Sequence, residues 1–454
     1  MSANVVVIFV NFIYIGMLKD PLIQASFGLG VSYFMFLYMS LNLACAEVTG
    51  IECGKHYGLK IRNDQDFKEG KTTKVEHEAA NEVIIINYNG ALGKGFILVS
   101  MVLLFSIITF VFAVEILYAI SISPENAYLT GYMVKFLIPG MILQSINFQL
   151  QSFVQAQDIM KPIGIANIVS IVACTCMCNW LVFDLKVGIL LFPICKIVME
   201  VCNMIGLCVC FCFAAKGTVR CASVADITKG LSPFLCQGFK FIAGLYAEFL
   251  GFEFNTYLAG LTHNQDQIAA FVAWVNIGGF LFTVGLGFSN VTRTRVANYM
   301  GSKDAVKSEN SAKFYIFLSA MVGLMFFVLI ECFRYQIASI YSPLPVIKDI
   351  IATLLIGYAF GAVCELILGC QNTLMRLTNR AMTMTWIMLS LYIVTLGCLS
   401  YFLGFFCGYG VPGMVMAFVV VSFLVNISFF FLINWRTDWE KCIEVMKENE
   451  KKEE

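Results

Sequence analysis

Glu248 and Glu253 stand five residues apart in an otherwise mostly apolar stretch, residues 239–261, that is long enough to cross a bilayer. A carboxylate at the centre of a membrane helix costs roughly 2.5–3.5 kcal/mol on insertion scales. Such acids are tolerated where they face water, each other or a cation, and they mark functional sites. The pair therefore predicts a protein that moves protons or cations across a membrane.

The spacing of the two acids limits how they can be arranged on one helix. At 3.6 residues per turn, Glu248 and Glu253 are separated by about 140° around the helix axis. They cannot share one narrow stripe, but they can flank a wide cavity, or one of them can face a neighbouring helix. Tyr257 lies one turn beyond Glu253 and is expected to line the same face.

A buried carboxyl group can exchange a proton for another cation without covalent chemistry. Burial disfavours the charged form, so such a group can load and release a proton near neutral pH. An organic cation in the same cavity favours the ionised form and expels the proton, which makes the two ligands competitors for one site. The further acids within apolar stretches are Glu47, Glu52, Glu115, Glu200 and Glu365.

A structural role is the alternative for each of these acids. Under this hypothesis Glu248 and Glu253 pair with Lys240 or with amides at helix ends. We favour the structural role for three acids that lie near the ends of apolar stretches, namely Glu52, Glu115 and Glu200.

Other kinds of chemistry find little support in the sequence. The three histidines, His56, His77 and His263, are scattered, so we expect no metal site. No phosphate loop of the form GxxxxGK[ST] occurs, so energy should come from an ion gradient. Without a nucleophile and base that converge, or a basic tract, we expect no enzyme, no cofactor and no nucleic-acid partner.

The elements that must position these residues are membrane helices. Hydrophobic residues make up 59% of the 454 residues and charged residues 13%, with a mean hydropathy of +0.79. A soluble domain carries about 25% charged residues, so we predict an all-α polytopic membrane protein of about twelve spans. The first predicted span, residues 3–18, is shorter than the roughly 20 residues that a membrane helix needs. The predicted spans are residues 3–18, 26–53, 95–120, 131–156, 162–183, 187–214, 233–259, 267–292, 312–335, 347–375, 381–405 and 411–435.

Basic residues predict the orientation of these spans. With both termini in the cytoplasm, 23 Lys and Arg residues lie on the cytoplasmic side, 4 lie on the opposite side and 3 lie within spans.

Two similar motifs indicate an internal repeat. GKHYGLK at 54–60 and VANYMGSK at 296–303 resemble each other, which indicates two six-helix copies inserted the same way. The predicted parts are an N-lobe (1–215) with a cytoplasmic loop at 59–93, a linker (216–232), a C-lobe (233–435) and a charged cytoplasmic tail (436–454).

Three motifs in the second half resemble those of the multidrug and toxic compound extrusion (MATE) family, particularly its eukaryotic branch. Glu248-FLGF-Glu253 is similar to the branch's pattern of two glutamates separated by four residues. TRVANYMG at 294–301 resembles the family's T-R-V-S-N-x-L-G. Glu365 precedes Arg376 by eleven residues, which is the spacing between the family's glutamate and its L-R-G segment.

The first half carries two further motifs and three departures. LQSFVQAQDIMKP at 150–162 resembles L-x-x-[YF]-L-Q-A-Q-x-x-x-x-P, and CGKHYG at 53–58 resembles C-G-Q-A-[YF]-G. The family's acid before the latter motif falls on Gly50, with Glu47 one turn away, and R-G reads Arg376-Leu377. The chain begins partway into the family's first span, so we expect a truncated first helix.

The resemblance implies a V-shaped, two-lobed antiporter, with no cofactor, that exports organic cations or other amphiphiles in exchange for H⁺ or, less often, Na⁺. Carried over by position, Glu248, Glu253 and Glu365 become the proton- or cation-coupling residues. The expected cavity residues are Asn276, which the resemblance points to, and Tyr257 and Glu47.

Two other functions remain open from the sequence. A flippase for lipid-linked sugars would need a basic cavity for pyrophosphate, whereas intramembrane acids outnumber Lys135, Lys196 and Lys240 here. A receptor or scaffold would need neither paired buried acids nor an internal repeat. We expect a multi-pass monomer in the plasma membrane or in a vacuolar or other internal membrane.

Overall fold

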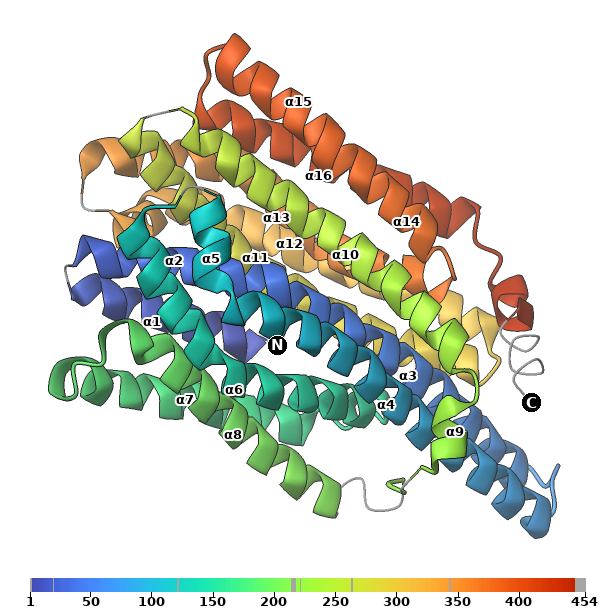
Figure 1. Ribbon diagram of the computed structural model, residues 1–454. Helices are drawn as coiled ribbons and strands as arrows, with labels where there is room; N and C mark the ends of the chain where they lie inside the picture. Colours follow the sequence, from blue (N-terminus) through green and yellow to red (C-terminus); the bar gives the residue numbers. More distant parts are fainter. Residues whose placement is uncertain are drawn as a thin grey trace. The chain divides into compact units, whose positions relative to one another are not determined.

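A computed structural model of the chain is helical throughout its regular elements, and no β-strand occurs in the part of the chain that it describes (Figure 1). The predicted all-α membrane fold is confirmed. His263, residues 216–217 and 221 of the predicted linker, and residues 446–454 of the predicted tail lie outside the described part. The described residues are 2–18, 20–120, 122–213, 218–220, 222–262, 264–342 and 344–445.

The chain divides into two compact units, each described here by itself. Unit 1 contains the described residues of Met1–Ile242 together with Ala297–Lys303. Unit 2 contains Ala243–Val296 and the described residues from Asp304 onward. Two long helices, α10 (Leu231–Gly260) and α11 (Gln265–Gly301), belong partly to each unit. The predicted lobes and their linker stay a prediction.

Most of the remaining helices overlap the predicted spans. Those of unit 1 are α1 (Ser2–Met17), α2 (Pro21–Phe34), η1 (Met35–Met39), α3 (Ser40–Lys68), α4 (Lys74–Val111), α5 (Ala113–Ala119), α6 (Pro124–Ala156), α7 (Lys161–Asn179), η2 (Trp180–Asp184), η3 (Gly188–Leu190), α8 (Leu191–Phe213) and α9 (Val224–Thr228). Those of unit 2 are α12 (Ala305–Tyr341), α13 (Pro345–Leu377), α14 (Ala381–Met388), η4 (Leu389–Thr395), α15 (Leu396–Tyr401), η5 (Phe402–Phe406) and α16 (Val411–Trp435).

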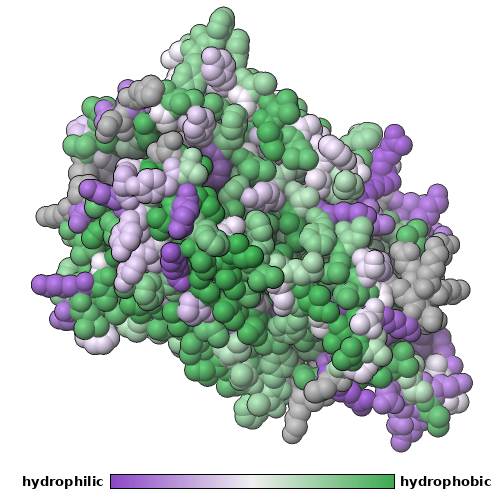
Figure 2. Space-filling view, in the orientation of Figure 1, coloured by the Kyte–Doolittle hydropathy of each residue, from purple (hydrophilic) through white to green (hydrophobic). Residues whose placement is uncertain are grey.

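Ten helical segments of the described chain are long and apolar enough to cross a membrane. The helix α1 is apolar but has only 16 residues, and α10 has 30 residues but carries three charges, Lys240, Glu248 and Glu253. Figure 2 shows a face dominated by hydrophobic side chains, with hydrophilic ones grouped on its left part and along its right edge. Large apolar side chains this exposed need lipid around them. The protein is an integral, multi-pass membrane protein.

The segment 59–93, expected as a cytoplasmic loop, is a helical hairpin in the structure. The helices α3 and α4 extend past their predicted spans and pack against each other around the turn at 69–73 (Figure 1). A capping box between Thr73 and Glu76 starts α4. Burial works against ionisation of Asp64, but hydrogen bonds from Asn81, His77 and Lys60 outweigh it, so its pKa lies below the ordinary value. Local hydrogen bonding therefore orders this polar segment.

The last turn of α11 packs against α3 inside unit 1, and the contact joins the two echoed motifs. A Cβ at Gly58 would overlap Asn298 O, and a Cβ at Gly301 would overlap Lys55 O. A Cβ at Gly54 would lie only 2.7 Å from Ala297 Cβ. Because glycine lacks a side chain, the two helix backbones can approach this closely.

The residues just before α9 are held on α4 by one asparagine. Asn89 Nδ2 donates to Thr218 O at 2.9 Å, and Asn89 Oδ1 accepts from the main-chain N–H of Arg220 at 3.1 Å. The guanidinium of Arg220 also pairs with Glu82 at 2.9 Å, although both side chains are more than half exposed. Exposed ion pairs contribute little, so Asn89 provides the main attachment to α4, and the Thr218 hydroxyl also donates to Gln157 Oε1 at 2.9 Å.

Replacing Asn89 by Ala should release residues 218–220 from α4. Three hydrogen bonds lose their side-chain partner, two of them to this segment. We expect trypsin to cleave after Arg220 several-fold faster, measured by time-resolved digestion of the purified protein. The control is Asn87→Ala, two residues earlier on the exposed side of α4. Equal cleavage rates in the two variants would contradict the attachment.

Candidate functional site

Polar side chains at seven-residue spacing form a stripe along α13. Seven residues make nearly two full turns, so Tyr358, Glu365 and Asn372 share one face of the helix. All three are buried in unit 2. The phenol of Tyr358 donates a 2.7 Å hydrogen bond to Glu365 Oε2. The other carboxyl oxygen, Glu365 Oε1, is buried without a hydrogen-bond partner among the described residues.

Asn372, at the C-terminal end of this stripe, contacts Glu248 of α10. Asn372 Nδ2 donates to Glu248 Oε2 at 3.4 Å, and the Glu248 side chain is 4% exposed. The carboxyl groups of Glu248 and Glu365 are near enough to interact electrostatically, and both also act on the Tyr392 phenol in η4. We call Glu248, Tyr358, Glu365 and Asn372 the acid cluster of unit 2.

The acid cluster contains no basic side chain. Within the described part of the chain, no ion pair joins Glu248 or Glu365 to a Lys or Arg. Lys240, the partner under the structural alternative, is exposed, whereas Glu248 bonds to an amide. A buried carboxylate without a counter-charge is costly, so it favours uptake of a proton or cation.

Glycines allow α11 to lie directly beside the cluster. Gly278 and Gly285 are also seven residues apart and so share a face of α11. A Cβ at Gly278 would lie 3.1 Å from the Tyr358 hydroxyl, and one at Gly285 would lie 3.2 Å from Glu365 O. A Cβ at Gly369 of α13 would lie 2.9 Å from the carbonyl carbon of Gly285. Larger residues here would push α11 away from Glu365.

The other predicted residues of α10 and α11 lie outside these hydrogen bonds. Glu253 is partly buried, and Tyr257 is 63% exposed. Asn276 donates to Val272 O of its own helix at 2.9 Å. The structure thus brings Glu248 and Glu365 together, while the roles of Glu253, Asn276 and Tyr257 stay predictions.

Three residues near the acids were not predicted from the sequence. Tyr358 and Asn372 stand seven residues on either side of Glu365, and this spacing is a signal that the sequence does contain. Tyr392 has no such signal, because it reaches the acids from a separate helix. It approaches α10 at Gly251, where a Cβ would lie 2.8 Å from Tyr392 Cβ.

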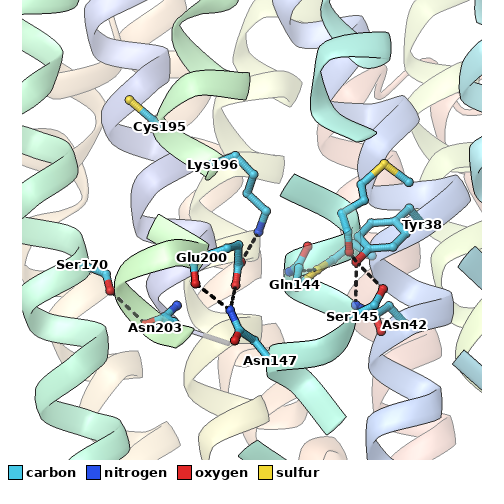
Figure 3. Close-up of polar contacts among 12 residues, drawn as sticks. Tyr38, Asn42, Gln144, Ser145, Asn147, Ser170, Cys195, Lys196, Glu200 and Asn203 are labelled. Atoms are coloured by element: carbon cyan, nitrogen blue, oxygen red, sulfur yellow. Dashed lines mark hydrogen bonds and ion pairs between the residues drawn. The ribbon is translucent and has the colours of Figure 1, made fainter. Parts of the chain in front are cut away.

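Unit 1 holds a second polar network, centred on α8 (Figure 3). Lys196 Nζ and Glu200 Oε1 form a 2.7 Å ion pair, with side chains 1% and 0% exposed. Glu52 pairs with Lys55 at 3.2 Å near the end of its predicted span. Glu52 and Glu200 thus have the ion-pair partners that a structural role requires, and the structural role of Glu52, Glu115 and Glu200 stays a prediction. Glu47 is buried in α3, and its predicted place in a substrate cavity stays a prediction.

Comparison with known proteins places these features in a family. The family model described as MatE matches residues 242–396, which contain Glu248, Glu253 and Glu365. Protein DETOXIFICATION 31 of Arabidopsis thaliana is 24% identical over 364 residues, covering 77% of this chain and 67% of the relative. Multidrug and toxin extrusion protein 1 of Danio rerio is 25% identical over 211 residues, covering 44% of this chain and 33% of the relative.

The fold is shared with solved transporters. The eukaryotic MATE transporter AtDTX14 superposes with a TM-score of 0.84 at 18% identity, covering 99% of this chain and 95% of that one. A transporter of the MOP superfamily from Pyrococcus furiosus gives a TM-score of 0.74 at 14% identity, covering 98% of this chain and 95% of that one. The matched family model, the similarity to curated relatives and the common fold together support placing this chain in the MATE family of small-molecule transporters, in its eukaryotic branch.

Proposed function

We propose that this protein is a secondary antiporter that exports organic cations or related amphiphiles in exchange for protons, with the acid cluster of unit 2 as the shared site. One observation carries the proposal: Glu248 and Glu365 are buried close together and lack a basic partner among the described residues. Two nearby buried carboxyl groups strongly disfavour double ionisation. The cluster therefore favours at least one bound proton unless a cation takes its place.

Competition for the cluster gives the transport cycle. When protons occupy the carboxyl groups, the cluster is uncharged and holds no organic cation. When an organic cation enters, its charge favours the ionised carboxylates and the protons leave. Because either ligand satisfies the same negative charge, a proton gradient can drive the cation in the opposite direction. Na⁺ is the alternative coupling ion, and the test below separates the two.

The flippase hypothesis has less support from this site. A pyrophosphate group needs basic side chains, and the described acid cluster offers carboxyl, phenol and amide groups instead. Relatives of this chain include proteins named for detoxification and for multidrug and toxin extrusion. Both considerations favour small cationic or amphiphilic substrates.

Purified protein in vesicles with an imposed pH gradient tests the proposal. We expect the gradient to drive movement of a quaternary ammonium ion and of a planar aromatic cation, but not of a neutral sugar. Collapsing the gradient with a protonophore should reduce the flux to that of protein-free vesicles. A separate arm replaces the pH gradient with a Na⁺ gradient. Movement driven by the Na⁺ gradient alone would overturn proton coupling, and no movement of any cation in either arm would overturn the antiporter itself.

A further inference from the structure

The buried ion pair of unit 1 lies inside a membrane helix. Lys196 and Glu200 are four residues apart on α8, within the apolar segment Gly188–Phe213. Their charged atoms are 2.7 Å apart, and both side chains are almost fully buried. Charges at such a position are tolerated when they neutralise one another and their remaining polar atoms are satisfied.

Residues from two other helices complete the pair. From α6, Asn147 Nδ2 donates to Glu200 Oε2 at 2.7 Å and to Glu200 O at 2.8 Å. The Lys196 ammonium lies 5.5 Å from the centre of the Phe34 ring, at the end of α2. The cation of Lys196 thus occupies the position beside Glu200 that an unattached cation would otherwise take.

Buried amide oxygens in this part of unit 1 have no hydrogen-bond donor among the described residues. Among the described residues, Asn42 Oδ1, Gln144 Oε1 and Asn147 Oδ1 are buried and accept no hydrogen bond. Figure 3 shows two hydrogen-bonded groups, Asn147 with Glu200 and Asn42 with Tyr38, and Gln144 lies between them. The Tyr38 phenol also interacts electrostatically with Glu200. Carboxylate, amide and phenol oxygens are the ligands that hard monovalent and divalent cations prefer.

The buried glutamates of the two units differ in whether they have a basic partner. Glu200 has a lysine attached to its own helix one turn away, whereas Glu248 and Glu365 have no basic partner in the described chain. The ammonium of Lys196 cannot leave Glu200 for the solution, because it is covalently part of α8. A carboxylate with a permanent counter-ion cannot bind a cation that exchanges with the solution.

We propose that Lys196 is a tethered cation that permanently fills an anionic site in unit 1, a site that would otherwise bind a proton or Na⁺. Removing the ammonium should therefore create a ligand-dependent site at Glu200. This inference concerns binding in unit 1 and stands independently of the transport cycle proposed for unit 2.

The thermal stability of purified Lys196→Met protein tests the inference. Loss of one partner leaves a buried charge unpaired and lowers the melting temperature. We expect this variant to regain stability when choline chloride is replaced by NaCl, or when the pH is lowered. Once the site begins to fill, the gain should be on the order of 1–2 °C for each tenfold rise in ligand.

Three variants separate a tethered cation from an ordinary structural ion pair. Lys196→Met/Glu200→Gln removes both charges and should lose the extra response to Na⁺ and to pH. This result would exclude the neighbours Tyr38, Cys174 and Cys195 as the source of the response. Lys196→Arg keeps the tethered charge and should behave like the parent. Lys135→Met removes an exposed lysine of α6 and controls for general charge effects.

The outcomes decide the inference in either direction. A Na⁺- or proton-dependent rise in the melting temperature that is specific to Lys196→Met supports it. If Lys196→Met folds and its melting temperature responds to Na⁺ and to pH no more than that of the parent, the tethered-cation role is wrong. If Lys196→Met fails to fold, Lys196→Gln replaces it, because the shorter amide removes the charge and still donates a hydrogen bond. The acid cluster of unit 2 is present in both proteins, so a response of equal size in the parent and in Lys196→Met would also overturn the inference.

Discussion

Vesicles that contain the Glu248→Gln or Glu365→Gln protein should show no pH-driven movement of an organic cation above that of protein-free vesicles. Each substitution removes a carboxyl group that, in the proposed cycle, binds either a proton or the cation. Glutamine is nearly isosteric, and its carbonyl can still accept from Asn372 or Tyr358, so the packing of the acid cluster should survive. The flux of the cation, followed with the pH gradient imposed, is the measurement.

A third acid and a control variant sharpen this experiment. Glu253→Gln tests the remaining predicted coupling residue, which is only partly buried. Glu331→Gln removes an acid of α12 that is 29% exposed and 3.7 Å from Arg334, and its flux should match the parent. Melting temperatures of all variants check that the proteins are folded. Full pH-driven flux in folded Glu248→Gln and Glu365→Gln proteins would remove the acid cluster from the mechanism.

Direct binding adds a measurement that does not depend on a gradient. In the Glu365→Gln protein, an organic cation should bind at least about tenfold more weakly, since a hydrogen-bonded charge contributes roughly 1.5–3 kcal/mol. Unchanged affinity would place the cation elsewhere, even if transport were lost.

The second large effect is expected where α3 meets the end of α11. Gly58→Ala and Gly301→Ala should each lower the stability of the protein by about 1–3 kcal/mol, the usual cost of overpacking. In both cases the new methyl group meets main-chain atoms of the facing helix, which cannot rotate away as a side chain can. Thermal unfolding of the purified variants measures the loss.

The same helix offers a matched control for this prediction. A Cβ at Gly287 of α11 has no neighbour within 4 Å in the described chain, so Gly287→Ala should be neutral or stabilising by about 0.5–1 kcal/mol. The double variant Gly58→Ala/Gly301→Ala should cost less than the sum of its parts, because the first methyl group already separates the helices. If Gly58→Ala and Gly287→Ala unfold at the same temperature, close packing at this contact is not the source of stability.

The hairpin at 59–93 is polar in sequence but helical in structure, so polarity alone did not predict its conformation. Its mixed charges suggested a loop, yet α3 and α4 continue through it. A long helix pair needs little apolar surface when its polar side chains bond to each other, as Asp64, His77 and Asn81 do. Helix-to-helix hydrogen bonds of this kind depend on which residues face each other across the turn, which hydropathy does not report.

The sequence by itself determined the membrane class, the approximate spans and the buried acids, because the cost of placing polar groups in lipid is large and local. It also contained the spacing of two pairs made within one helix: Lys196 and Glu200 lie one turn apart, and Tyr358 and Glu365 lie about two turns apart on the same face. Only the tertiary structure joined Glu248 to Asn372, more than a hundred residues away, and Asn147 to Glu200. The pairing of helix faces depends on many weak contacts and on close approaches such as that of Gly285 and Gly369. The summed energy of these contacts cannot be read from any short stretch of sequence.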